Sequence, residues 1–279
     1  MNLNLSRRGF LGGALVSSAA VSGSAAAQTP ANTEDVKLGV ASYSLREFQR
    51  GLAIRMLRKL NVSYVSVKEF HLPYRSSPEE LRRGAREFER AGIKIISGGV
   101  IYLQQDDDDD IRRYFEYAKA CGMPMMIIGP TRQTLPRIEK FVKEYDIKVA
   151  IHNHGPEDKH FPSPEVALKA LQGMDPRMGV CVDVGHTTRT GTSAVESIES
   201  AGSRLLDVHI KDLRDLMDAK SQCPVGDGAM PIPAIFKALK NMNYQGYVNL
   251  EYEIEGDDPM PGIAKSLAYM RGVLAGLRG

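Results

Sequence analysis

The stretch Val149–His154, with the sequence VAIHNH, decides the fold predicted for this chain. It is an apolar, β-branched run that ends in polar side chains, a pattern typical of a buried strand with functional groups at its carboxyl end. The same form recurs in Val180–His186 (VCVDVGH), in Asp207–Asp212 (DVHIKD) and in Asn249–Glu253 (NLEYE). Four successive strands are therefore expected to finish in histidine or carboxylate.

Short apolar runs alternate with amphipathic stretches from residue 37 onward. The expected strands are Lys37–Ala41, Ser63–Lys68, Lys94–Ser97, Met125–Ile128, Lys148–His152, Gly179–Asp183, Leu205–Ile210 and Tyr247–Tyr252. Helical patterns between them include Leu52–Leu60, Pro78–Ala91, Ile111–Cys121, Leu135–Tyr145, Ala234–Met242 and a last one over 261–277. Strands that alternate with helices predict parallel pairing through right-handed crossovers. Eight such units favour an α/β fold with a single TIM barrel. No G-x-G-x-x-G follows the first strand, which argues against a dinucleotide-binding sheet.

The first 27 residues are predicted to be a twin-arginine export signal rather than part of the fold. A twin-arginine segment, Ser6–Leu11 (SRRGFL), precedes a weakly apolar run that ends in three alanines suited to signal cleavage. We therefore expect a catalytic barrel domain over residues 28–279 in a periplasmic or otherwise exported protein. The alternative is a disordered or anchoring N-terminus, but the run is too short for a confident membrane span. No stable membrane span is expected after processing.

Charge and cysteine content narrow the possible partners. The chain has 36 Lys and Arg against 34 Asp and Glu, and removal of Arg7 and Arg8 leaves 34 of each. A neutral chain lacks the basic surface that binding to a nucleic acid requires, so a small molecule is the expected partner. The three cysteines show no paired spacing, and Cys121 and Cys181 are expected to be core thiols. The oligomeric state is left open.

Four residues are the candidate ligands of one divalent metal ion: His152, Asp183, His209 and Glu251. Each follows an apolar residue near a strand end, so alternation allows all four to point into the barrel mouth. Two imidazoles and two carboxylates suit manganese, cobalt, zinc or iron, and magnesium is also considered. The alternative is that each side chain is a separate capping or hydrogen-bonding group.

Further polar residues are expected around this site. His154 shares strand parity with His152, and Lys211 shares it with His209, so both are candidate catalytic or substrate-contacting groups. His186, just past the sixth strand, is a candidate substrate contact. The opposite wall of the pocket is assigned to Glu69 and His71, with Lys68 ranked below them, and Tyr43, after the first strand, is a further candidate substrate contact. The base is expected to be Glu251, Glu69 or a histidine that does not bind the metal. The alternatives are ordinary loop and rim residues.

The run of five aspartates at 106–110 has two interpretations. It could bind a hard cation, but it is better explained as the start of a helix. Carboxylates at that position meet the positive end of the helix dipole, and Arg112 and Arg113 could pair with them.

These strand-end motifs resemble the xylose-isomerase-like barrel superfamily, also called the sugar phosphate isomerase/epimerase family. The resemblance extends from Gly39–Tyr43 (GVASY) to Glu251, and its most specific segments are Asp183–His186 and His209–Asp212. It implies that Asp183, His209 and Glu251 bind a metal and that His186 contacts substrate. The Gly226-Asp227-Gly228 turn is similar to the family's loop before the last helix and strand, which makes Asp227 a candidate substrate-binding residue.

One position departs from the family pattern. Epimerases and isomerases of this group usually carry Glu where this chain has His152. Two opposed bases are needed to invert a carbon, and a metal-bound imidazole has already donated its lone pair. The resemblance then favours a metal-dependent β-eliminating lyase on keto sugars or 3-keto-glycosides, similar to inosose dehydratase and the exported 3-keto-glycoside lyases. A sugar isomerase or epimerase and a non-catalytic carbohydrate-binding barrel are the alternatives. A nuclease is opposed by the neutral charge and the export signal.

Overall fold

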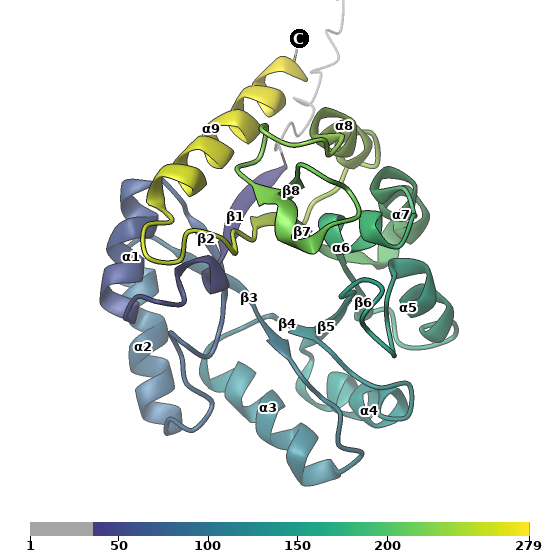
Figure 1. Ribbon diagram of the computed structural model, residues 1–279. Coiled ribbons are helices and arrows are strands. Elements are labelled where there is room, and N and C mark those ends of the chain that lie inside the picture. The colour runs from purple at the N-terminus through teal and green to yellow at the C-terminus, as the bar shows by residue number, and fades with distance from the viewer. Residues whose placement is uncertain (1–35, 279) are drawn as a thin grey trace, which may run out of the picture. The chain divides into compact units, whose positions relative to one another are not determined.

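The computed structural model describes residues 36–278, so the predicted export signal lies outside the described part of the chain. Eight parallel strands close into a barrel in the order β1-β10-β7-β6-β5-β4-β3-β2 (Figure 1). They are β1 (Lys37–Ala41), β2 (Tyr64–Val67), β3 (Lys94–Ile101), β4 (Met125–Ile128), β5 (Lys148–His152), β6 (Met178–Asp183), β7 (Leu205–Ile210) and β10 (Tyr247–Leu250). The predicted single TIM barrel is confirmed.

Helices form a ring around the barrel, as Figure 1 shows. They are α1 (Arg50–Lys59), α2 (Pro78–Arg90), α3 (Asp108–Ala120), α4 (Leu135–Tyr145), α5 (Pro164–Ala170), α6 (Val184–Arg189), α7 (Ala194–Ala201), α8 (Ile232–Asn241) and α9 (Met260–Gly276). The sequence did not predict α5, α6 or α7, which are eight residues or fewer and too short for a clear helical period. It also missed a small hairpin of β8 (Asp212–Leu213) and β9 (Gln222–Cys223) at the barrel mouth.

Three strand ends differ from the prediction in a way that matters for the site. Strand β2 stops at Val67 and β10 at Leu250, earlier than expected, whereas β3 continues to Ile101. Residues that follow β2 and β10 are therefore in loops, where strict alternation no longer decides the direction of a side chain. Their positions depend on contacts with other elements.

Apolar side chains fill both the space between strands and helices and the barrel interior. The inner group includes Val100, Met125, Ile127, Ala150 and Cys181. Cys121, Cys181 and Cys223 are free and buried, as expected for the first two from their apolar surroundings. This packing gives the strand ends a rigid base, because close-packed interiors yield little to local strain.

The barrel interior also contains a buried polar group centred on Asp207 of β7. Its carboxylate accepts hydrogen bonds from Asn249 Nδ2 at 2.8 Å and from Ser97 Oγ at 3.3 Å. Burial raises the pKa of Asp207 to about 6. The hydrogen bonds stabilise a carboxylate that would otherwise be costly to bury.

The run of aspartates opens α3, as the sequence predicts. Asp107 is the N-cap residue, and its side chain accepts a hydrogen bond from the backbone N–H of Asp110 at 2.9 Å. Arg113 pairs with Asp110 at 2.6 Å, while Arg112 pairs with Glu144 of α4 instead. The run therefore caps a helix and joins it to its neighbour.

Two observations bear on where ligands or membranes could contact the protein. Within residues 36–278, every helix is too short or too polar to span a bilayer.

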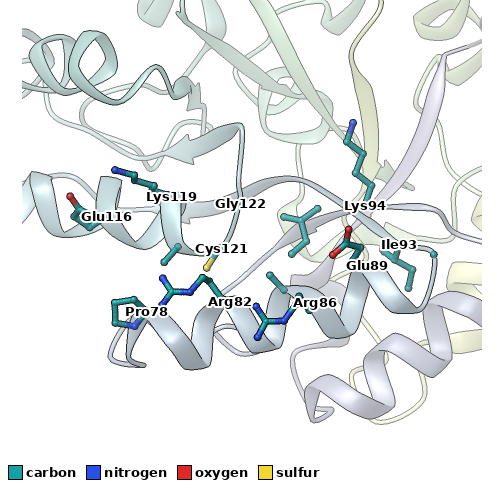
Figure 2. A pocket seen from close by; sticks show the side chains of 14 residues that line it. Pro78, Arg82, Arg86, Glu89, Ile93, Lys94, Glu116, Lys119, Cys121 and Gly122 are labelled. Atoms are coloured by element: carbon teal, nitrogen blue, oxygen red, sulfur yellow. The ribbon is translucent and has the colours of Figure 1, made fainter.

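A groove of about 820 Å³ lies between α2 and α3 at the start of β3, lined by Arg82, Arg86, Glu116 and Lys119 among others (Figure 2). It contains none of the candidate site residues, so it is not the candidate active site.

Candidate metal centre

Four side chains from neighbouring strands meet at the carboxyl end of the barrel: His152, Asp183, His209 and Glu251, here called the donor cluster. One ligand atom of each lies within 4.8 Å of the others. The Nε2 atom of His152 is 3.2 Å from Nδ1 of His209 and 3.6 Å from Oδ2 of Asp183. The Nδ1 atom of His209 is 3.4 Å from Oε1 of Glu251. The convergence predicted from strand alternation is confirmed.

These separations fit the coordination of one metal ion. In a tetrahedral site with bonds of about 2.1 Å, ligand atoms lie about 3.4 Å apart. The three ligand-atom distances given above, 3.2, 3.4 and 3.6 Å, bracket that value. The nitrogen and oxygen donors are those that zinc, manganese, cobalt and iron accept. The donor cluster could therefore hold a divalent ion in the structure as it stands.

Strand register and backbone hydrogen bonds place the donors. Asp183 lies directly beside His209, at the paired ends of β6 and β7. Asn153 accepts a hydrogen bond at 3.0 Å from the backbone N–H of Asp183, and Oδ1 of Asp183 accepts another at 2.8 Å from the backbone N–H of His186. Asp183 thus caps α6 with one oxygen and offers the other to the cluster.

The segment after β10 is held by the β8–β9 hairpin. Gln222 donates to the carbonyl oxygen of Glu251 at 2.7 Å and accepts from the backbone N–H of Glu253 at 2.9 Å. These two bonds clamp the residues on either side of buried Tyr252. Glu251 and Glu253 are consequently fixed at the mouth although the strand ends at Leu250.

Lys211 joins the carboxylates of the site. Its Nζ lies 3.1 Å from Asp183 Oδ2, 3.0 Å from Glu251 Oε2 and 2.6 Å from Glu253 Oε2. Burial disfavours the charged amine, but the three carboxylates outweigh it and raise the pKa of Lys211. Lys211 is therefore an ammonium group that holds Asp183 and Glu251 in place. It is buried and its three carboxylate contacts match its three protons, so it positions other groups rather than acting as a free base.

The protonation states of His152 and Glu251 suit a cation, whereas the groups around His209 outweigh its burial and raise its pKa, so this imidazole must lose a proton to bind a metal. Burial lowers the pKa of His152 to about 3, which leaves a neutral imidazole at ordinary pH. Burial opposes ionisation of Glu251, but Lys211 and His209 reverse that and hold its pKa below the usual range. Metal ions bind neutral imidazole and ionised carboxylate, so both groups are in the binding form.

Two more histidines border the donor cluster. The ring of His154 lies 4.5 Å from that of His152, and His186 lies 5.9 Å from both, measured between ring centres. Burial lowers the pKa of His186 to about 4, and its Nδ1 lies 3.2 Å from a guanidinium nitrogen of Arg189. His154 contacts Asp158 Oδ2 through Nδ1 at 3.3 Å. Both predicted neighbours of the metal site are thus brought to it.

The loops after β1 and β2 carry the other predicted wall. Lys68 Nζ donates to the carbonyl of Val100 at 3.2 Å and lies 5.5 Å from the ring centre of Tyr43. Glu69 accepts from the hydroxyl of Tyr74 at 3.3 Å and lies 4.0 Å from Lys68 Nζ. Lys68 therefore shares this wall with Glu69 and Tyr43, because β2 has already ended.

Comparison with known proteins identifies the family. The family described as xylose isomerase-like TIM barrel matches residues 54–273. The chain belongs to this family. The resemblance inferred from the strand-end motifs is thereby confirmed, and the matched range contains all four residues of the donor cluster.

Individual relatives of this xylose isomerase-like barrel are distant. An inosose dehydratase of Clostridium perfringens is 28% identical over 151 residues, 48% of each chain. Across several such dehydratases, the chain spans between a third and a half of their length. A solved uncharacterised protein of Parabacteroides distasonis is 28% identical, with a TM-score of 0.67 over 85% of this chain and 99% of that one. An IolI protein solved with a bound zinc atom is 18% identical, with a TM-score of 0.71 over 86% and 99%.

The structure corrects the prediction for His71. Its side chain is buried, Nδ1 is 3.0 Å from Ser42 Oγ and Nε2 is 3.1 Å from the carbonyl oxygen of Phe48. Both ring nitrogens are therefore engaged inside the fold. The prediction extended strand alternation past Val67, where the strand has ended.

The substrate contact predicted for Asp227 gains no support from its surroundings. Asp227 pairs with Lys265 of α9 at 2.6 Å. The turn that contains it wraps the carboxylate of Asp212, which accepts hydrogen bonds from the backbone N–H groups of Gly226 and Gly228. The turn of this barrel is thus a structural clamp on the segment after β7.

Several residues of the site were not singled out from the sequence. Asn153 and Gln222 position donors, Glu253 completes the contacts of Lys211, and Asp158 orients His154. Asn153 and Glu253 stood in the quoted strand-end motifs, so their proximity to donors was a usable signal. Gln222, in the two-residue strand β9, and Asp158, in the loop after β5, lie outside those motifs and gave no such signal.

Proposed function

We propose that this xylose isomerase-like barrel is a divalent-metal-dependent enzyme that removes a proton beside a carbonyl group of a sugar. We favour a β-eliminating lyase on keto sugars or 3-keto-glycosides. The donor cluster carries the proposal, because its four side chains are spaced for one ion at the mouth of the barrel. The dehydratase names of the curated relatives support elimination, and the zinc of the IolI neighbour supports a metal.

An ion held by the donor cluster would polarise the oxygen atoms of a bound sugar and stabilise the negative charge that forms on proton removal. The chain's own residues must remove the proton. His154 lies beside the cluster and outside it, so when Nδ1–H donates to Asp158 its Nε2 keeps a lone pair that is not bound to the ion and that accepts a hydrogen bond from the Tyr102 hydroxyl at 3.3 Å. This arrangement favours His154 as the base, with Glu251 as the other candidate on this side.

Elimination also requires a group near the departing oxygen. Glu69 lies on the wall formed by the loop after β2, where it contacts Tyr74 and Lys68. Glu69 is our candidate for the group that lies near the departing oxygen. Lys211 keeps Asp183 and Glu251 ionised and in place throughout.

The position of His152 separates the lyase from its main alternative. Inversion of a carbon needs a base on each face, and His152 offers Nε2 to the donor cluster. Elimination needs proton removal on only one face. A sugar isomerase or epimerase is therefore the second candidate, and a non-catalytic carbohydrate-binding barrel is the third.

The first prediction tests metal-dependent elimination. Protein loaded with Mn²⁺, Co²⁺ or Zn²⁺ should release the aglycone from a 3-keto-glucoside. Asp183→Asn should lower metal affinity by about 100-fold or more, since losing even an outer partner of a ligand costs about 10–100-fold. The measurements are product release by chromatography and metal affinity by chelator competition, with Asp109→Asn as a surface control.

Each alternative predicts a different result in the same assay. Full activity after exhaustive chelation would contradict the role of a metal. Incorporation of solvent deuterium without loss of the aglycone would identify an isomerase or epimerase. Saturable sugar binding without turnover would leave only the binding barrel.

We also propose export by the twin-arginine route. The support is the order of the elements in residues 1–27: paired arginines, a weakly apolar run and three alanines. The second prediction is that Arg7→Lys combined with Arg8→Lys keeps the protein in the cytoplasm, whereas the unchanged chain reaches the periplasm in a shortened form. Fractionation and mass spectrometry of the mature N-terminus measure this. Equal export of both chains would contradict the proposal.

A further inference from the structure

An exposed aromatic ring stands beside the donor cluster and contacts His154, the candidate base. Tyr102 directly follows β3, at the carboxyl end of the barrel, and 53% of its surface is exposed. Large aromatic side chains at that level of exposure lose the benefit of burial. Such a residue at the mouth of a barrel is a candidate ligand contact.

The ring is nevertheless held in one orientation by its neighbours. It lies close over Gly129, where a Cβ atom would stand only 2.8 Å from Tyr102 Cδ1. It is stacked on the ring of His154, with centres 5.8 Å apart and planes inclined by 24°. The hydroxyl lies 3.3 Å from His154 Nε2. Contacts with two separate loops therefore fix an exposed ring.

The fixed ring faces the same mouth as the donor cluster. His154, on which it stacks, lies 4.5 Å from His152 between ring centres. A ligand held by the cluster would thus extend over or beside this ring.

We propose that Tyr102 is the platform on which the closed ring of the sugar rests while its oxygen atoms face the donor cluster. The proposal rests on the proposed function and narrows its substrate class to pyranose rings, as in 3-keto-glycosides, rather than open-chain keto sugars. The C–H groups of a pyranose form an apolar face with positive edges, which complements the negative face of an aromatic ring. A ring that is already fixed loses little conformational entropy when the sugar binds.

Binding of an unreactive sugar tests the platform without requiring turnover. The probe is methyl β-D-glucopyranoside, titrated calorimetrically into metal-loaded protein, with the open-chain alcohol sorbitol for comparison. Tyr102→Ala should weaken binding of the glucoside about tenfold, the upper value for one aromatic contact. Tyr102→Phe keeps the ring and should stay within about threefold of the unchanged protein. Leu52→Ala, which truncates an exposed apolar residue on α1, is the control and should have no effect.

A second variant moves the ring without removing it. Gly129→Ala places a methyl group against Tyr102 and should weaken glucoside binding several-fold, while circular dichroism and the melting temperature report whether the fold is kept. The proposal is overturned if the unchanged protein does not bind the glucoside, if it binds sorbitol equally well, or if Tyr102→Ala binds the glucoside normally. It is also overturned if Tyr102→Phe is as weak as Tyr102→Ala, because the hydroxyl would then be the contact.

Turnover separates this proposal from the proposed function. On a 3-keto-glucoside, Tyr102→Ala should raise KM about tenfold relative to Tyr102→Phe, which also lacks the hydroxyl beside His154, and kcat of the two variants should agree within a few-fold, as expected for loss of uniform binding. Glucoside binding that depends on Tyr102 without any turnover would support the platform and reject the lyase. Metal-dependent turnover with an unchanged KM in Tyr102→Ala would support the lyase and reject the platform.

Discussion

Asp212 shows how one buried carboxylate can fix a whole turn. It accepts hydrogen bonds from the backbone N–H groups of Gly226, Gly228 and Met230 at 2.9–3.1 Å. The strand-end motif that contains Asp212 and the Gly-Asp-Gly turn were separate signals in the sequence. In the structure they are two sides of one contact, which supports the segment after β7 that begins with Lys211.

The third prediction concerns this contact. In Gly228→Ala, the new Cβ would lie 2.2 Å from Asp212 Oδ1, so the turn or the carboxylate must move. We expect a loss of about 2–4 kcal/mol in the free energy of unfolding, the range for strain combined with a broken buried network. Urea unfolding measures it. In Gly272→Ala on α9, the added Cβ meets no atom within 4 Å, so this variant should be more stable by about 0.5–1 kcal/mol. Equal stability of the two variants would contradict this account.

Among the elements, α3 illustrates how local charge sets the start of a helix. Asp107 caps the helix, and Asp108 contacts Arg137 and Lys140 of α4, so one acidic run both begins α3 and links it to its neighbour. The hard-cation interpretation of this run is not needed, because the carboxylates already have these partners.

The fourth prediction separates capping from charge. Asp107→Ala removes the side-chain acceptor for the backbone N–H of Asp110 and should destabilise the protein by about 1 kcal/mol. Asp109→Ala removes only an exposed charge in the first turn and should lower the free energy of unfolding by about 0.3 kcal/mol. Chemical denaturation at matched salt compares them. If Asp109→Ala costs as much as Asp107→Ala, the effect is one of charge and not of capping.

For the whole molecule, the donor cluster couples metal binding to stability. Its ligands come from β5, β6, β7 and the end of β10, so they converge only when the barrel is closed. An ion that binds the folded chain and not the unfolded one must stabilise the fold by mass action.

The fifth prediction follows from this coupling. A metal ion at 100 times its Kd should raise the free energy of unfolding by about 2.7 kcal/mol. For a domain of this size, that corresponds to an increase in Tm of about 5–10 °C. Thermal unfolding with metal and after chelation measures it, with Asp183→Asn as the comparison. An unchanged Tm in the native protein, or an equal shift in Asp183→Asn, would show that the cluster does not bind the ion.

The sequence alone determined the barrel and the direction of three of the four residues in the donor cluster. Both depend on local patterns: apolar runs set the strands, and strand parity directs His152, Asp183 and His209 to one face. These patterns are local because adjacent residues of a strand point to opposite sides whatever the rest of the chain does.

The tertiary structure decided everything beyond the strand ends. It turned His71 into the packed interior, placed Asp227 against α9, and brought Tyr102 onto His154 from a loop far away in the sequence. It also gathered three carboxylates around Lys211. Loop residues have no period to direct them, so their positions follow from contacts between distant segments that form only in the folded barrel.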